Sequence, residues 1–203
     1  MSQRTNLFVT TTQQNPGKRT RLIQAATNLV YRHGFKETRL ADIADNANVP
    51  PGNVYYYFKT KDEIGSAIID ERLSQIKRLH QRLDELDSPQ ERLCAFVQMT
   101  CDNRKMLAHG GCPIGTLCTE LHKEDGALAK QSAVLFEQIL GWLKLQFEAL
   151  GLRSDSQGLA VHLLSALEGI AVLAHSLSDP KIVVTETERL QGWIRTVGTS
   201  AKE

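Results

Sequence analysis

The chain has 203 residues, of which 41% are hydrophobic and 23% are charged. This is enough for one sizeable core, or for a small domain beside a larger one. Four irregularly placed cysteines with no signal peptide ahead of them argue against a disulfide framework and predict a cytoplasmic protein. The net charge is only +1, but residues 1–65 hold nine Lys/Arg against five Asp/Glu, whereas residues 66–203 hold fifteen against eighteen. The basic excess therefore lies at the N-terminal end.

The N-terminal residues predict an arm followed by a helix. Residues 1–16 are polar and rich in Thr and Gln without sustained periodicity, which is typical of a mobile arm. A first helix is expected from Lys18 to His33, and Gly34 would close it as the residue after its C-terminus. The residues expected along its buried face are Leu22, Ala25, Ala26 and Leu29.

Residues 38–64 have the pattern of a helix-turn-helix. Apolar residues recur at helical spacing behind Thr38, a favourable N-cap, so a helix is expected from Arg39 to Ala47, before Asn48. Pro50 and Pro51 suit only the first turn of a helix, so a second, short helix should begin there and end before Lys59. The side chains expected to face outward are those of Gly52, Asn53, Tyr56 and Tyr57, with Val54 and Phe58 facing inward. A short aromatic helix flanked by lysines is the layout of a DNA-reading motif.

This segment resembles the fingerprint of the TetR family of transcriptional regulators. The matching residues are Thr38, Ile43-Ala44, Asn48-Val49, Tyr55-Tyr56-Tyr57, Phe58 and Lys61 to Ile64. The close match covers residues 18–67, about a quarter of the chain. The resemblance implies an all-α fold with an N-terminal three-helix DNA-binding domain and a larger helical domain that binds ligand and dimerises. We therefore expect an arm at residues 1–16, a DNA-binding domain at 17–62 and a ligand-binding and dimerisation domain at 63–203.

The resemblance also implies roles for individual residues on DNA. Tyr55 and Lys61 match phosphate-binding positions, and Arg39 falls where the family meets the DNA backbone. Asn53 is the side chain best suited to read a base, because its amide can pair with N6 and N7 of adenine. Pro50-Pro51 departs from the family pattern, in which polar residues are common, and this leaves the operator sequence open. The expected DNA contacts are Arg39, Gly52, Asn53, Tyr55, Tyr56, Tyr57, Lys59 and Lys61, with Arg4 of the arm as a further candidate. The alternative, that the aromatic run is only core, is accepted for Phe58.

The remainder of the chain also predicts helices. They are expected at residues 61–86, 89–107, 113–122, 126–150, 155–177 and 185–198. Residues 159–177 are apolar nearly all round and, at 19 residues, long enough to span a membrane. Glu168 near the centre would cost about 2.5–3.5 kcal/mol on insertion, so burial between the subunit and a partner is favoured over a span. The expected dimer interface is Ala160, Ala166, Gly169, Ala174 and Trp193. The alternative is an ordinary core helix within one chain.

The second domain shows no catalytic motif, so we expect neither an enzyme nor a cofactor. Five potential metal ligands crowd into residues 109–122, but their spacing matches no standard zinc pattern, and no metal is expected. The residues expected to line a ligand pocket are Phe96, Met99, Cys101, Cys112, Leu117, Phe136, Leu140 and Trp142, with plain core packing as the alternative.

Cys112 is the cysteine that the sequence singles out. It precedes Pro113 and follows Gly110-Gly111, so it is expected at the N-cap of a short helix, where the helix dipole favours a thiolate. His109 could add positive charge. The stretch GCPIGTL is also similar to a cysteine-bearing element of some electrophile-responsive TetR-like regulators. The alternative is a small, inert cysteine beside a tight turn.

These features predict a homodimeric TetR-like regulator that binds a palindromic operator. We expect a repressor, with double-stranded DNA, a small-molecule or electrophile inducer and a second copy of the chain as partners, and no membrane. The alternative is a thiol-based sensor or cysteine enzyme whose helix-turn-helix docks protein instead of DNA.

Overall fold

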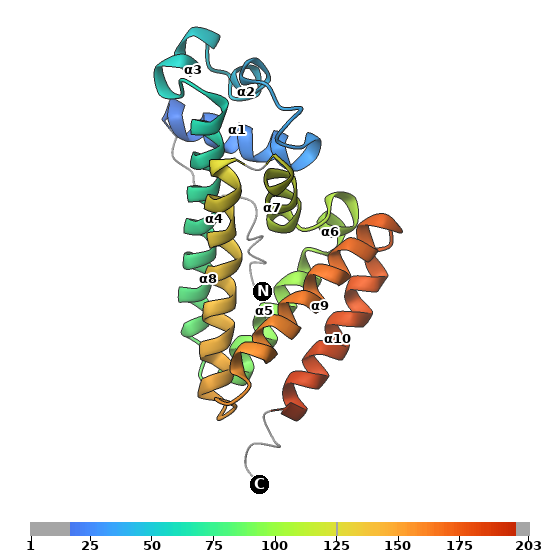
Figure 1. The fold of residues 1–203 in the computed structure, drawn as a ribbon. Coiled ribbons are helices and arrows are strands. Elements are labelled where there is room, and N and C mark those ends of the chain that lie inside the picture. Colours follow the sequence, from blue (N-terminus) through green and yellow to red (C-terminus); the bar gives the residue numbers. More distant parts are fainter. Residues whose placement is uncertain (1–16, 125, 198–203) are drawn as a thin grey trace. The chain divides into compact units, whose positions relative to one another are not determined.

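The computed structural model describes residues 17–124 and 126–197, and the secondary structure within these ranges is helical (Figure 1). The helices are α1 Lys18–His33, α2 Leu40–Asn46, α3 Pro51–Tyr57, α4 Lys61–Asp84, α5 Pro89–Asp102, α6 Arg104–Gly110, α7 Pro113–Lys123, α8 Ala127–Ala149, α9 Ser156–Ser176 and α10 Pro180–Val197. The all-α expectation is confirmed. The expected arm, with Arg4, lies outside the described residues.

The described residues form two compact units. The first unit contains residues 17–74 and 113–136, and the second contains residues 75–112 and 137–197. The long helices α4 and α8 therefore contribute to both units, and α7 groups with the helix-turn-helix. The functional division expected at residue 62 stays a prediction.

The helix-turn-helix forms nearly as expected, with one correction at its start. Gly34 closes α1 with φ 86°, and its N–H donates to the Val30 carbonyl at 2.8 Å. The N-cap of α2 is Arg39, not Thr38, and the carboxylate of Asp42 accepts from the Arg39 N–H at 3.2 Å. Thr38 is buried, and its hydroxyl donates to the Gly34 carbonyl at 2.7 Å, so this hydroxyl stabilises the turn instead of the helix end.

Two helix boundaries in the second unit differ from the sequence-based expectation. The helix expected at 89–107 breaks at Asn103, whose buried side-chain amide donates to the Met99 carbonyl at 2.8 Å. Asn competes in this way with regular backbone geometry. The last helix begins at Pro180 and not near 185, because Pro fits the first helical position. Asp179 completes that start by accepting from the Lys181 N–H at 2.8 Å.

Each unit has its own apolar core. In the first unit, the fully buried residues include Leu22, Ile43, Val54, Ile64 and Ile68. In the second unit, α10 packs against both α5 and α9, and the buried residues there include Leu93, Val97, Leu143, Phe147, Leu163 and Ile194.

Helix α9 is, by length and composition alone, long and apolar enough to cross a membrane. A core helix passes the same test, and α9 buries Leu163, Leu164, Leu167, Ile170 and Ala171 inside the second unit. The structure therefore shows one side of α9 packed within the second unit.

Candidate functional site

The surface of α3 combines a buried anchor with exposed polar and aromatic side chains. Val54 and Phe58 are 1% and 2% exposed and hold the helix against the first unit. Tyr55 and Tyr56 are 56% and 76% exposed, and Asn53 is half-buried. The two tyrosine rings are therefore accessible from outside the chain. The roles expected for Gly52, Asn53, Tyr55, Tyr56 and Tyr57 stay predictions.

Several basic residues lie around α2 and α3. Arg39 is exposed at the start of α2, and the Lys59 ammonium donates to the Tyr55 carbonyl at 2.8 Å, where it caps the end of α3. Two arginines of α1 also contact the motif. The Arg19 guanidinium lies 5.4 Å from the centre of the Phe58 ring, and Arg21 Nη1 donates to the Asn48 carbonyl at 3.5 Å. The sequence-based list of candidate DNA contacts did not include these two arginines. Their position in the basic N-terminal part of the chain was the signal that could have added them.

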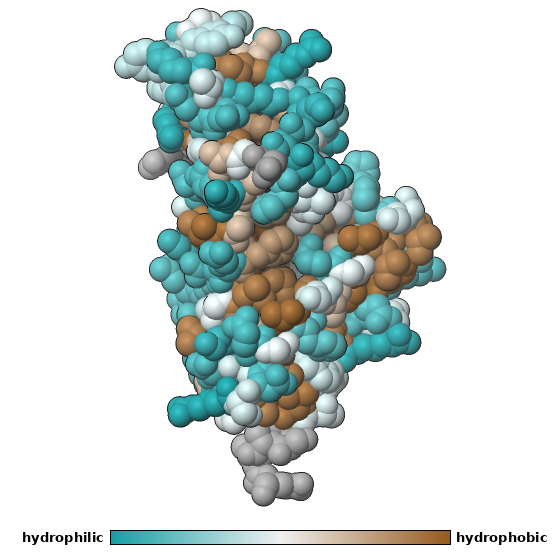
Figure 2. All heavy atoms as spheres, viewed as in Figure 1, coloured by the Kyte–Doolittle hydropathy of each residue, from teal (hydrophilic) through white to brown (hydrophobic). Residues whose placement is uncertain are grey.

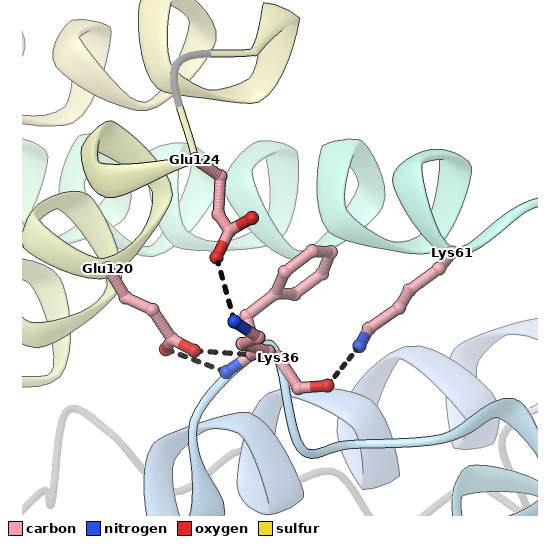
Figure 3. Close-up of polar contacts among 5 residues, drawn as sticks. Lys36, Lys61, Glu120 and Glu124 are labelled. Atoms are coloured by element: carbon pink, nitrogen blue, oxygen red, sulfur yellow. Dashed lines mark hydrogen bonds and ion pairs between the residues drawn. The ribbon is translucent and has the colours of Figure 1, made fainter.

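Lys61 makes contacts inside the chain at the position where a phosphate contact was expected. Its ammonium donates to the Lys36 carbonyl at 2.7 Å and lies 4.9 Å from the centre of the Phe35 ring (Figure 3). The ammonium has further donors for a phosphate. Its first role in this structure, however, is to hold the turn between α1 and α2.

An aromatic cluster with a buried histidine lies in the second unit. The His80 ring stacks on Trp142 with 4.7 Å between ring centres, and Phe96 lies 5.7 Å from the same ring. Trp142 Nε1 donates to the Asp84 carboxylate at 2.9 Å. His80 is 5% exposed, and neither of its ring nitrogens has a hydrogen-bond partner. Burial lowers the pKa of His80 to about 4, although Asp84 acts in the opposite direction. The ring is therefore neutral at pH 7.

The residues expected to line a ligand pocket are divided between the two units. The second unit contains six of them, and the first unit contains the other two. Those in the second unit are Phe96, Met99, Cys101, Cys112, Leu140 and Trp142, and those in the first are Leu117 and Phe136. Phe96, Leu117 and Trp142 are buried and the others are half-buried. His80 and Asp84 were missed, although His80 lies at helical spacing between Ile76 and Leu83 on the apolar side of α4. A polar residue among apolar ones on the same side of a helix is the sequence signal that could have identified His80.

The surroundings of Cys112 differ from those that the sequence suggested. Its side chain hydrogen-bonds Glu168, whose pKa is raised by burial and lowered in part by this hydrogen bond. A carboxyl group beside a thiol does not favour a thiolate, in contrast to the positive charge expected from His109. Cys118 is buried and donates to the Ser132 carbonyl, with 3.4 Å between the sulfur and the oxygen. Burial raises the pKa of the Cys94 thiol, an effect that Arg195 partly offsets.

The potential metal ligands of residues 109–122 have other contacts. His122 Nδ1 lies 2.9 Å from the Cys118 carbonyl oxygen, and Glu120 accepts hydrogen bonds from the turn after α1. Within residues 17–124 and 126–197, no group of three or more His, Cys, Asp or Glu residues is arranged to hold a metal ion.

The expected dimer residues of α9 fall on two different sides of the helix. Ala160 and Ala174 are fully buried within the chain, so the expectation that they face a partner is wrong. Gly169 is exposed, and a Cβ atom there would meet nothing within 4 Å. Ala166 is half-buried. Trp193 on α10 packs inside its own unit, 5.0 Å from the His162 ring and 6.0 Å from Phe147.

Large apolar side chains extend the exposed side of α9. The exposed fraction is 43% for Val161, 61% for Val172, 53% for Leu173 and 65% for Leu177. Figure 2 shows hydrophobic residues gathered where α9 ends and α10 begins. Exposed apolar residues in a contiguous group are typical of a protein interface.

Comparisons with known proteins find similar sequences both for the helix-turn-helix segment and for most of the chain. Residues 22–68 match the family model described as bacterial regulatory proteins, tetR family. An uncharacterized HTH-type transcriptional regulator in the lacX 3' region of Lactococcus lactis subsp. lactis is 26% identical over 88% of this chain and 93% of its own length.

Two further proteins match in fold. The HTH-type transcriptional repressor NemR of Escherichia coli is 29% identical over 51% of this chain and 53% of its own. Its reduced form superposes with a TM-score of 0.75 at 18% identity, over 87% of this chain and 96% of that one. FadR of Bacillus subtilis in complex with stearoyl-CoA superposes with a TM-score of 0.68 at 18% identity, over 86% and 96%.

Proposed function

Because the chain belongs to the tetR family of bacterial regulatory proteins, we propose that it is a homodimeric repressor of transcription that an inducer releases from a palindromic operator. The chain is a transcriptional regulator with an N-terminal helix-turn-helix. Repression, the operator and the inducer are the proposed part. A repressor among the relatives, NemR, supports the first of these.

The geometry of α3 is the observation that carries DNA binding. Val54 and Phe58 fix the helix to the core, while Asn53, Tyr55 and Tyr56 lie at its surface. Basic side chains lie nearby on α1 (Arg19 and Arg21), at the N-cap of α2 (Arg39) and directly after α3 (Lys59). Phosphate contacts by such residues position a protein on DNA, and base contacts by a side chain such as Asn53 select the sequence.

The second unit binds the inducer in this proposal. His80 supports it, because a buried neutral imidazole with no hydrogen-bond partner can pair with a hydroxyl or carbonyl group of a ligand. Phe96 and Trp142 supply aromatic surface beside it. The fold-related FadR, which was crystallised with stearoyl-CoA, supports a small-molecule ligand for a chain of this fold. Glu168 beside Cys112 favours a non-covalent inducer over a thiol-reactive one.

The test is selection of duplexes from a random DNA library by the purified chain. We expect an inverted repeat, bound as a dimer with half-sites one helical turn apart, and an affinity that falls steeply with salt. A scrambled duplex of the same length and base composition is the control. Binding of both duplexes with equal affinity, or of neither, would refute the proposal and favour a motif that docks protein.

A further inference from the structure

The turn between α1 and α2 is held by a carboxylate from α7. Glu120 accepts two backbone hydrogen bonds, from the Phe35 N–H to Oε2 and from the Lys36 N–H to Oε1, each at 2.7 Å (Figure 3). Both N–H groups lie just beyond the end of α1. Hydrogen bonds to a charged acceptor are stronger than neutral ones, and the use of both oxygens fixes the orientation of the turn.

The same turn is held from α4. The Lys61 ammonium donates to the Lys36 carbonyl at 2.7 Å, so α7 holds the N–H of Lys36 and α4 holds its C=O (Figure 3). Gly34 makes this approach possible. It adopts φ 86° and ψ 159°, which is essentially a glycine-only conformation, and a Cβ atom there would lie 3.0 Å from Glu120 Oε1.

The position of the turn decides where α2 and α3 lie. Only Glu37 and Thr38 separate Lys36 from the N-cap of α2, and the Thr38 hydroxyl is itself bonded to the Gly34 carbonyl. Helix α2 in turn packs on α1 and α3. A displacement of the turn would therefore move the residues expected on DNA, although neither Glu120 nor Lys61 lies in α2 or α3.

We propose that Glu120 is a positioning residue for DNA binding, which holds the α1–α2 turn so that α2 and α3 meet the operator in register. The proposal rests on the proposed function of the helix-turn-helix. It assigns Glu120 no contact with DNA. Loss of its carboxylate should therefore lower the affinity for the two half-sites of the operator. The preference for particular bases, which is assigned to α3, should not change.

The test uses the full-length chain and an operator selected by that same chain. In Glu120→Gln the amide keeps the size of the side chain, but its NH₂ group opposes one of the two backbone N–H donors. We expect operator affinity to fall about tenfold or more, which corresponds to the loss of one charge-assisted hydrogen bond. The difference in affinity between the native half-site spacing and spacings one base pair longer or shorter should become smaller. The base preference should stay unchanged.

Glu124→Gln is the matched control, in the turn directly after the same helix. Glu124 pairs with the Lys36 ammonium at 3.8 Å, but both side chains are largely exposed, so we expect operator affinity within about twofold of the parent. Circular dichroism and sedimentation of each variant establish that fold and assembly are retained.

Different results separate this proposal from the proposed function. A parent chain that selects no duplex overturns both. A parent that binds its operator while Glu120→Gln matches it in affinity and spacing preference overturns the positioning role alone. If Glu120→Gln does not fold, hydrogen exchange of the parent decides: slow exchange at the Phe35 and Lys36 amides supports the contact, and exchange as fast as in an exposed turn overturns it.

Discussion

At the scale of single residues, the surface proposed to face DNA combines side chains expected to contact phosphates with a side chain expected to read bases. Asn53 presents an amide, which can pair with two atoms of one adenine. Tyr55 presents one hydroxyl on an exposed ring, and Arg39 presents a charge at the start of α2. These chemical differences make the roles separable by measurement.

Asn53→Ala should weaken binding to the selected operator by about 1–3 kcal/mol and relax the preference at one base position in each half-site. Tyr55→Phe should instead weaken all operator variants equally, because only a phosphate contact is lost. Affinities for a set of single-base operator variants test both. Equal effects of Asn53→Ala on every variant would contradict its role as a reader.

Arg39→Ala provides the charge control for the same surface. Its loss should reduce the slope of log affinity against log salt by about one unit per phosphate contact, which Tyr55→Phe should not do. An unchanged slope would remove Arg39 from the phosphate contacts.

At the scale of helices, most of the fold could be predicted from the sequence. Proline and glycine marked the ends of α1, α3, α5 and α7, because their backbone restrictions act locally. Two of the errors arose where a side chain made a contact that spacing does not reveal. Thr38 bonds to Gly34 instead of capping α2, and Asn103 bonds to Met99 and breaks an expected helix.

The candidate site was predictable in its local part only. The exposed face of α3 follows from helical spacing around Val54 and Phe58. Glu120 could not be found in this way, since it lies 84 and 85 residues from the amides it binds. Ala160 and Ala174 were assigned to a partner because a helix that is apolar all round does not reveal which side its own chain covers.

Helix α4 carries a pH-dependent term in stability through His80. Its pKa is about 4 in the folded chain and about 6.5 in an unfolded one, so the unfolded state binds more protons between these values. The free energy of unfolding should therefore be unaffected by this group above pH 6.5. It should fall as the pH drops from 6.5 toward 4, by as much as about 3 kcal/mol.

His80→Phe isolates this term, because it keeps a ring against Trp142 and removes both unpartnered nitrogens. Urea unfolding at pH 7 and pH 4.5 should show a smaller loss of stability in the variant than in the parent. All other titrating groups are common to both chains, so the difference reports His80. An equal loss of unfolding free energy between pH 7 and pH 4.5 in the two proteins would show that His80 does not titrate as a buried group.

At the scale of the whole molecule, the exposed apolar side of α9 is where a second copy is expected. Val161, Val172, Leu173 and Leu177 lie on α9 or directly after it, beside the open surface of Gly169. Two recognition helices are needed for an inverted repeat, and a dimer places them one turn of DNA apart. Assembly and operator binding should therefore fail together.

Val172→Glu tests this expectation, since Val172 is 61% exposed and its replacement costs the single chain little. We expect the variant to sediment as a monomer and to lose operator affinity by about 100-fold or more, because the second half-site no longer binds in the same complex. Leu145→Glu is the matched control: Leu145 on α8 is 59% exposed and lies outside α9, so the dimer and its affinity should persist. A Val172→Glu monomer that binds the operator as tightly as the parent would show that one copy is sufficient. A Val172→Glu dimer would show that the partner lies on another face of the chain.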